Sequence, residues 1–169
     1  MCDLGRRSQV LIAMCSLIVA LSLSGCSGDA EPDDKTVREQ FSNNSAAYEE
    51  LRAMLWEDVR KSDVSFVSAD YPERTQCGQK PQRHRCSMPV ERWNEYQQRF
   101  KVLGIVWLEY IEPSERFYFV TYYRSFGMDA RLRGIVSCKD TSPQPSSFYP
   151  KQEWQPLYDG WYSFLMVDS

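Results

Sequence analysis

Apolar side chains return with helical spacing in two stretches of the chain. In residues 36–61, and again in residues 89–103, they recur every three, four or seven positions. Such spacing places them on one face of an amphipathic helix. We therefore predict two helices whose apolar stripes are Phe41, Tyr48, Leu51, Leu55 and Val59 in the first and Val90, Trp93, Tyr96, Phe100 and Leu103 in the second.

Short signals in the sequence mark the ends of these helices. Asp33 or Asp34 can cap the first helix, because a carboxylate accepts hydrogen bonds from the free backbone N–H groups at a helix start. Residues 42–45, Ser-Asn-Asn-Ser, are unfavourable in a helix interior, so a later start near Ser45 is the alternative. Gly104 is a typical terminator for the second helix.

Four later segments have the β-branched and aromatic composition of strands. They are residues 105–111, 116–123, 131–138 and 161–167, and residues 64–67 are a shorter candidate. Aromatic side chains alternate onto both faces of the second segment, which indicates a central strand or one covered by helices. The predicted fold class is α+β, with two amphipathic helices packed on one face of an antiparallel sheet of about four strands.

The composition is that of an ordinary globular protein. Apolar residues make up 43% of the 169 residues and charged residues 25%, which argues against a disordered chain. The formal net charge of -3 excludes a broad electrostatic attraction to nucleic acid. We therefore expect no nucleic-acid partner.

The first 26 residues have the layout of an export signal. Arg6 and Arg7 supply positive charge, and a mostly apolar run follows from Val10 to Leu23. This run is too short for a membrane-spanning helix, which needs about 20 apolar residues. It ends in Leu23-Ser24-Gly25-Cys26. An aliphatic residue and two small residues before an obligatory cysteine resemble the lipobox of bacterial lipoproteins.

The resemblance implies a lipid anchor and a division of the chain. In this family a diacylglycerol is attached to the cysteine thiol and a peptidase cuts before it, so Cys26 would be the lipidated first residue. Residues 1–25 would be the signal peptide, 26–35 the lipidated cysteine and its tether, and 36–169 a single globular domain. Ser27 implies an outer-membrane location facing the periplasm under enteric-type sorting. The alternative is an ordinary cleaved signal with an incidental Cys26.

Three cysteines remain beyond the expected anchor, at Cys77, Cys86 and Cys138. In an oxidising compartment we expect a Cys77–Cys86 disulfide, because the two are close in sequence with Gly and Pro between them; pairing of Cys138 with one of them is the alternative. The enclosed loop would be an exposed basic finger that touches an anionic surface, or simply a solvated loop. Its charged candidates are Lys80, Arg83, His84 and Arg85.

Catalytic signatures are missing from the sequence. It contains no Gly-x-Ser-x-Gly, no Ser-x-x-Lys and no phosphate-cradling glycine-rich loop. The dispersed cysteines and the one histidine do not have the spacing of metal ligands. We therefore expect a protein that is not an enzyme and that needs neither metal nor cofactor.

Aromatic residues near the C-terminus are the remaining candidates for binding. Trp154 and Trp161 could line a groove for a sugar or peptide, although a core role is the alternative. The predicted function is a non-catalytic envelope protein, held in the membrane by its lipid, that binds another envelope protein or a surface polymer. The alternatives are a small periplasmic hydrolase and a structural or stress lipoprotein without a discrete ligand.

Overall fold

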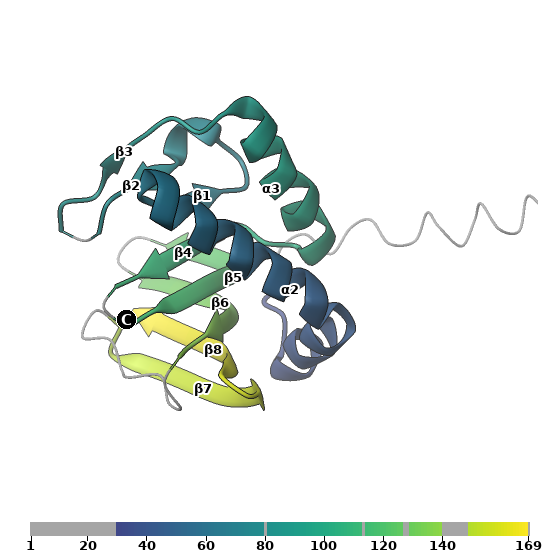
Figure 1. Cartoon of the computed structure of the whole chain (residues 1–169). Coiled ribbons are helices and arrows are strands. Elements are labelled where there is room, and N and C mark those ends of the chain that lie inside the picture. The colour runs from purple at the N-terminus through teal and green to yellow at the C-terminus, as the bar shows by residue number, and fades with distance from the viewer. Residues whose placement is uncertain (1–29, 80, 113, 127–128, 140–148, 169) are drawn as a thin grey trace, which may run out of the picture. The chain divides into compact units, whose positions relative to one another are not determined.

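The computed structural model describes residues 30–79, 81–112, 114–126, 129–139 and 149–168 (Figure 1). Of the chain's two units, Met1–Glu31 and Pro32–Ser169, the second holds every described helix and strand. The helices are α2 (Asp34–Ser62), α3 (Val90–Leu103) and the 3-10 helix η1 (Pro72–Arg74). The strands are β1 (Val64–Ser68), β2 (Gln76–Cys77), β3 (His84–Arg85), β4 (Trp107–Ile111), β5 (Arg116–Phe126), β6 (Asp129–Ser137), β7 (Lys151–Tyr158) and β8 (Trp161–Asp168).

The eight described strands form one antiparallel sheet in the order β3-β2-β1-β4-β5-β6-β8-β7. The predicted α+β class is confirmed, but the expected number of about four strands is wrong. The missed strands β2 and β3 have two residues each, which is too short to show any alternation. The missed strand β7 contains Pro156 and lies at the sheet edge, where a residue without an N–H donor is tolerated.

Helix α2 begins at the earlier of the two expected starts. Asp33 is its N-cap, and its carboxylate accepts a hydrogen bond of 2.8 Å from the backbone N–H of Thr36. The start near Ser45 is wrong, and only Asn44 departs from helical backbone angles (φ -132, ψ 18). Val37 and Phe41 are buried in the first part of the helix, and their burial compensates for the unfavourable local sequence.

Replacing Asp33 with asparagine should remove an acid-sensitive part of the stability. Hydrogen bonds from Thr36 hold the pKa of the Asp33 carboxyl below its ordinary 3.8. A carboxyl with a lowered folded-state pKa stabilises the fold above its unfolded-state pKa and loses this contribution as the pH falls through the folded-state value. The melting temperature of the wild type should therefore drop in acid relative to Asp33→Asn, whose amide caps without titrating. A difference between the two proteins that is independent of pH contradicts this.

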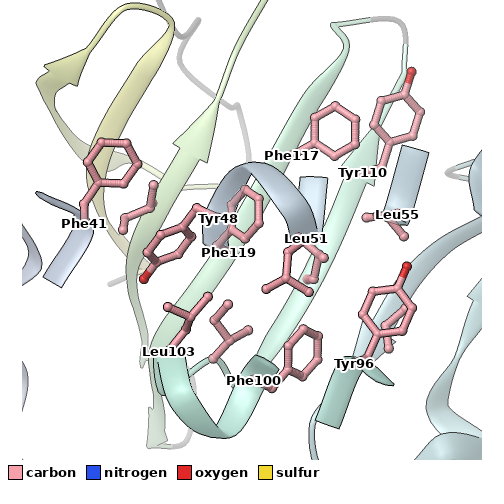
Figure 2. Packing of buried hydrophobic residues seen from close by; sticks show 14 of the residues in the cluster. Phe41, Tyr48, Leu51, Leu55, Tyr96, Phe100, Leu103, Tyr110, Phe117 and Phe119 are labelled. Carbon is pink, nitrogen blue, oxygen red and sulfur yellow. The ribbon is translucent and has the colours of Figure 1, made fainter. Parts of the chain in front are cut away.

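A hydrophobic core lies between the two helices and one face of the sheet (Figure 2). At its centre the ring of Phe119 lies 5.4 Å from that of Tyr48 and 5.5 Å from that of Trp161. The predicted stripes of both helices supply most of the helical part of this core. The exception is Val90, which is 65% exposed because it is the first residue of α3. The residues labelled in Figure 2 are Phe41, Tyr48, Leu51, Leu55, Tyr96, Phe100, Leu103, Tyr110, Phe117 and Phe119.

The opposite face of the sheet carries a second apolar cluster. Strand β5 contributes Phe117 and Phe119 to the helix side and Tyr118 and Val120 to the other side, and all four are buried. This confirms the prediction that β5 is a central strand. The buried members of the second cluster are Tyr118, Val120, Leu132, Val136, Cys138, Phe164 and Met166.

Candidate functional site

A groove of about 320 Å³ lies between one side of α2 and the beginning of β5. The helix contributes residues 49, 52, 53 and 56, whose spacing places them along one line of its surface. Because Glu115 and Phe117, at the beginning of β5, face this line, charged and aromatic groups from both segments come together. The lining residues are Glu49, Arg52, Ala53, Trp56, Glu115 and Phe117.

Trp56 provides the exposed aromatic surface of this groove. Its side chain is 38% exposed, and its ring packs edge-on against Tyr110 and Phe117, with centroid distances of 5.5 and 6.3 Å. Those two rings are neighbours on paired strands, 4.8 Å apart, as Figure 2 shows. The indole therefore rests on a fixed aromatic base, so little freedom remains to be lost when a ligand stacks on it.

The charged groups of the groove are also held in place by neighbours. Arg52 Nη2 lies 2.8 Å from Glu49 Oε2, and Arg52 Nη1 donates to Ser137 Oγ at 3.2 Å. The second carboxylate oxygen of Glu49 accepts a 2.9 Å bond from Trp161 Nε1. The sheet thus fixes a carboxylate and a guanidinium on one side of the groove.

The other side of the groove adds one more charged group, Glu115. Glu115 Oε2 forms an ion pair of 2.9 Å with Lys139 Nζ. Tyr110 is buried beneath Trp56 and is not part of the lining; its burial, together with the charges of Glu112 and Glu115, raises its pKa to about 12. The groove therefore combines a flat apolar ring with donors and acceptors in fixed positions, an arrangement suited to binding a polar ring-shaped ligand.

A second, more open depression of about 420 Å³ lies beside α3. Its lining includes Gln97, Gln98 and Lys101, and its only aromatic member, Phe100, is buried in the core. It offers a ligand no exposed aromatic surface, so the α2–β5 groove is the better candidate.

The two cysteines expected to pair are joined in the structure. The sulfur atoms of Cys77 and Cys86 are at disulfide distance and their Cα atoms are 5.7 Å apart, consistent with the expected disulfide. Cys138 is buried and keeps its thiol. The chosen pairing is therefore favoured over the alternative with Cys138.

The loop between these cysteines exposes two of its described basic residues, His84 and Arg85, but not Arg83. Arg83 is only 9% exposed and its Nη1 lies 2.8 Å from Glu109 Oε1, so its charge is compensated within the fold. His84 and Arg85 are exposed and form β3, which pairs with β2. Lys80 lies outside the described residues. Backbone pairing of β3 with β2, and of β2 with β1, makes the segment that contains His84 and Arg85 the edge of the sheet.

The two tryptophans predicted to bind a ligand are not brought together. Trp161 is 2% exposed and lies in the core beneath α2, where its indole N–H supports Glu49. Trp154 is half-buried in the second cluster on the opposite face, with ring distances of 6.4 Å to Tyr118 and 5.8 Å to Phe164. The expectation that the two tryptophans share a binding surface is therefore wrong. The alternative, a role in the core, is correct for Trp161.

Local sequence patterns indicate the groove only weakly. Trp56 flanks the predicted apolar stripe of α2, and Glu49 and Arg52 belong to a side that composition marks as solvent-exposed. Phe117 and Glu115 come from a distant part of the chain. Only the alignment of Glu49, Arg52 and Trp56 along one line of the helix could have suggested a site.

Comparison with protein-family models, with curated proteins and with solved structures finds no match for this chain. Of the helices in the described ranges, none has both the length and the hydropathy required to cross a bilayer. The residues and geometry of the chain itself are therefore the basis for assigning a function.

Proposed function

We propose that this protein is a lipid-anchored, non-catalytic component of a bacterial cell envelope that binds a surface polymer built from sugars in the α2–β5 groove. The sequence Leu23-Ser24-Gly25-Cys26 after an apolar run supports the anchor. The half-exposed ring of Trp56, with charged groups fixed around it, is the observation that supports binding.

The size and chemistry of the groove favour a sugar over a protein surface. A stable protein interface buries about 800 Å² on each partner around several anchor residues, whereas this groove of about 320 Å³ offers one exposed indole. A pyranose ring has an apolar C–H face that can stack on an indole and hydroxyl groups at its rim. Glu49, Arg52 and Glu115 are placed around the indole as acceptors and donors for such hydroxyls.

Replacing Trp56 with alanine should weaken binding to envelope polysaccharide about fivefold to tenfold, because an aromatic stack contributes roughly 1–1.5 kcal/mol. Trp56→Phe should retain part of the affinity, since it keeps a flat ring. The matched control is Tyr158→Ala, which removes an aromatic side chain that is also exposed but does not line the groove. Co-sedimentation with polysaccharide isolated from the host envelope measures the affinities.

Two results would reject the sugar-binding proposal. One is equal affinity of the wild type and Trp56→Ala for the polysaccharide. The other is binding that a purified envelope protein, but no polysaccharide fragment, displaces. Circular dichroism of each variant establishes that a loss of binding does not come from unfolding.

Cys26 should be the first residue of the mature protein and carry lipid. Mass spectrometry of the N-terminal peptide from the membrane fraction is expected to show an acylated cysteine. Cys26→Ala should abolish both processing and acylation, because the thiol is the acceptor. A chain that starts elsewhere, or a Cys26→Ala protein that is processed and membrane-bound as usual, contradicts the anchor.

A further inference from the structure

We propose that three cations on the sheet, Arg124, Arg131 and Lys151, form a docking row that holds the domain against the anionic headgroups of its membrane. This inference rests on the lipid anchor of the proposed function. It concerns a different surface from the sugar-binding groove. The docking row is defined by strand register and by its position beside the beginning of α2.

The register aligns the three cations across four neighbouring strands. Arg124 on β5 pairs with Arg131 on β6, which pairs with Val167 on β8, which pairs with Lys151 on β7. Directly paired residues point to the same face, so these side chains form one line. Three strand spacings of about 4.8 Å make the line about 14 Å long. All three cationic side chains are exposed.

The placement of Arg124 opposite Arg131 is unfavourable for the isolated fold. Like charges directly opposite each other on paired strands are destabilising. Stability alone therefore does not account for the pair of arginines. Glu153 offsets part of the charge, with Oε1 3.8 Å from Lys151 Nζ, and both arginines also interact with other groups of the chain. A guanidinium has five N–H donors, so such contacts leave capacity for phosphate oxygens.

The docking row lies next to the point where the chain enters the folded unit. Arg133, two residues from Arg131 and therefore on the same face about 7 Å away, forms an ion pair with Asp34. Asp34 also accepts a 2.6 Å bond from Gln155 Nε2 on β7. The first turn of α2 is thus fixed to β6 and β7 beside the docking row.

The tether is short enough for the position of Asp34 to decide which basic surface lies nearest the expected anchor. Cys26 is eight residues before Asp34, and at no more than 3.6 Å per residue the connection spans at most about 29 Å. The exposed His84 and Arg85 are on β3, at the opposite edge of the sheet from β7. Seven strand spacings of about 4.8 Å separate those edges, about 34 Å along the sheet. The docking row, rather than β3, is therefore the basic surface nearest the expected anchor.

The test uses the full lipidated protein reconstituted in phosphatidylcholine vesicles with or without phosphatidylglycerol. Amide hydrogen exchange is measured in peptides that cover residues 122–126, 129–133 and 149–156. We expect exchange at least fivefold slower on the anionic vesicles at low salt, since each basic residue near an anionic surface gains roughly fivefold in affinity. High salt should abolish the difference because it screens exposed charges.

Matched variants assign the effect to the docking row. The triple variant Arg124→Gln, Arg131→Gln and Lys151→Gln should lose the protection. The control variant replaces Arg60, Arg74 and Arg85, three exposed cations outside the docking row, with glutamine. It makes the same change in net charge and should keep the protection. Unchanged exchange in α2 core peptides shows that both variants are folded.

Each remaining outcome decides between the anchor and the docking row. If Cys26 is acylated but amide hydrogen exchange is the same on anionic and zwitterionic vesicles, the docking row is overturned and the anchor is kept. Loss of protection in the control variant, or equal protection on purely zwitterionic vesicles, also overturns it. An unmodified Cys26 overturns the anchor and, with it, this inference.

Discussion

Replacing Gly134 with alanine is expected to cost about 3 kcal/mol of the free energy of unfolding, a large part of the roughly 5–15 kcal/mol that stabilises a typical domain. A Cβ atom at this position would lie 2.1 Å from the carbonyl oxygen of Phe119 and 3.0 Å from the Cα of Val120. These are backbone atoms of β5, the strand paired with β6, and they cannot rotate away. The register of β5 shifts between Val120 and Tyr122, which accompanies this close approach. Urea unfolding followed by circular dichroism measures the loss.

Gly104 provides the matched control for this substitution. It ends α3 with a φ of 60°, and a Cβ there would meet nothing closer than Gln40 Nε2 at 3.8 Å. Gly104→Ala should therefore cost only the conformational penalty of a left-handed residue, about 1–2 kcal/mol. Equal losses for the two glycine variants would mean that the clash at Gly134 is relieved by strand movement.

Replacing Asp58 with alanine is expected to destabilise the protein by about 3 kcal/mol. Its carboxylate accepts a 2.7 Å bond from the hydroxyl of Tyr96 and bonds of 3.2 and 2.9 Å from Nε of Arg92. Tyr96 is 0% exposed and the Asp58 side chain only 14%, so water cannot replace the lost acceptor at the hydroxyl. These contacts join α2 to α3. Removing them leaves a buried donor unsatisfied and a half-buried charge without its main partner.

A double-mutant cycle separates this network from general effects of the substitution. Tyr96→Phe removes only the hydroxyl and should cost about 1–2 kcal/mol. Asp58→Ala combined with Tyr96→Phe should lose less than the sum of the single losses, because the orphaned hydroxyl is absent. Strict additivity would contradict the coupling. Burial and the adjacent Asp58 carboxylate raise the pKa of Tyr96, so its hydroxyl remains a donor at neutral pH.

Local periodicity was sufficient to predict both helices and the central strand. The stripes of α2 and α3 place Tyr48, Leu51 and Phe100 in the core because a helix that packs on a sheet must bury one face. The edge strand β7 could not be predicted in the same way. It exposes charged side chains and contains Pro156, features that local patterns assign to loops.

The site was harder to predict than the fold because it depends on contacts distant in sequence. Trp154 and Trp161 have similar sequence surroundings, but the register of β7 and β8 places their side chains on opposite faces of the sheet. Arg83 looks like a surface cation until β4 brings Glu109 beside it. Trp56 is held in its exposed position by contacts with Tyr110 and Phe117, which come from the sheet.

The bonds at the beginning of α2 also determine how the domain carries mechanical load. A pull on the chain before Asp33 reaches the Asp34–Arg133 ion pair together with the bond from Gln155 and the bond from Arg38 to Gln155. Contacts loaded together share the force, whereas the turns of an unsupported helix would peel away one after another. Tension on the chain before Asp33 is therefore passed to β6 and β7, in the interior and at the edge of the sheet.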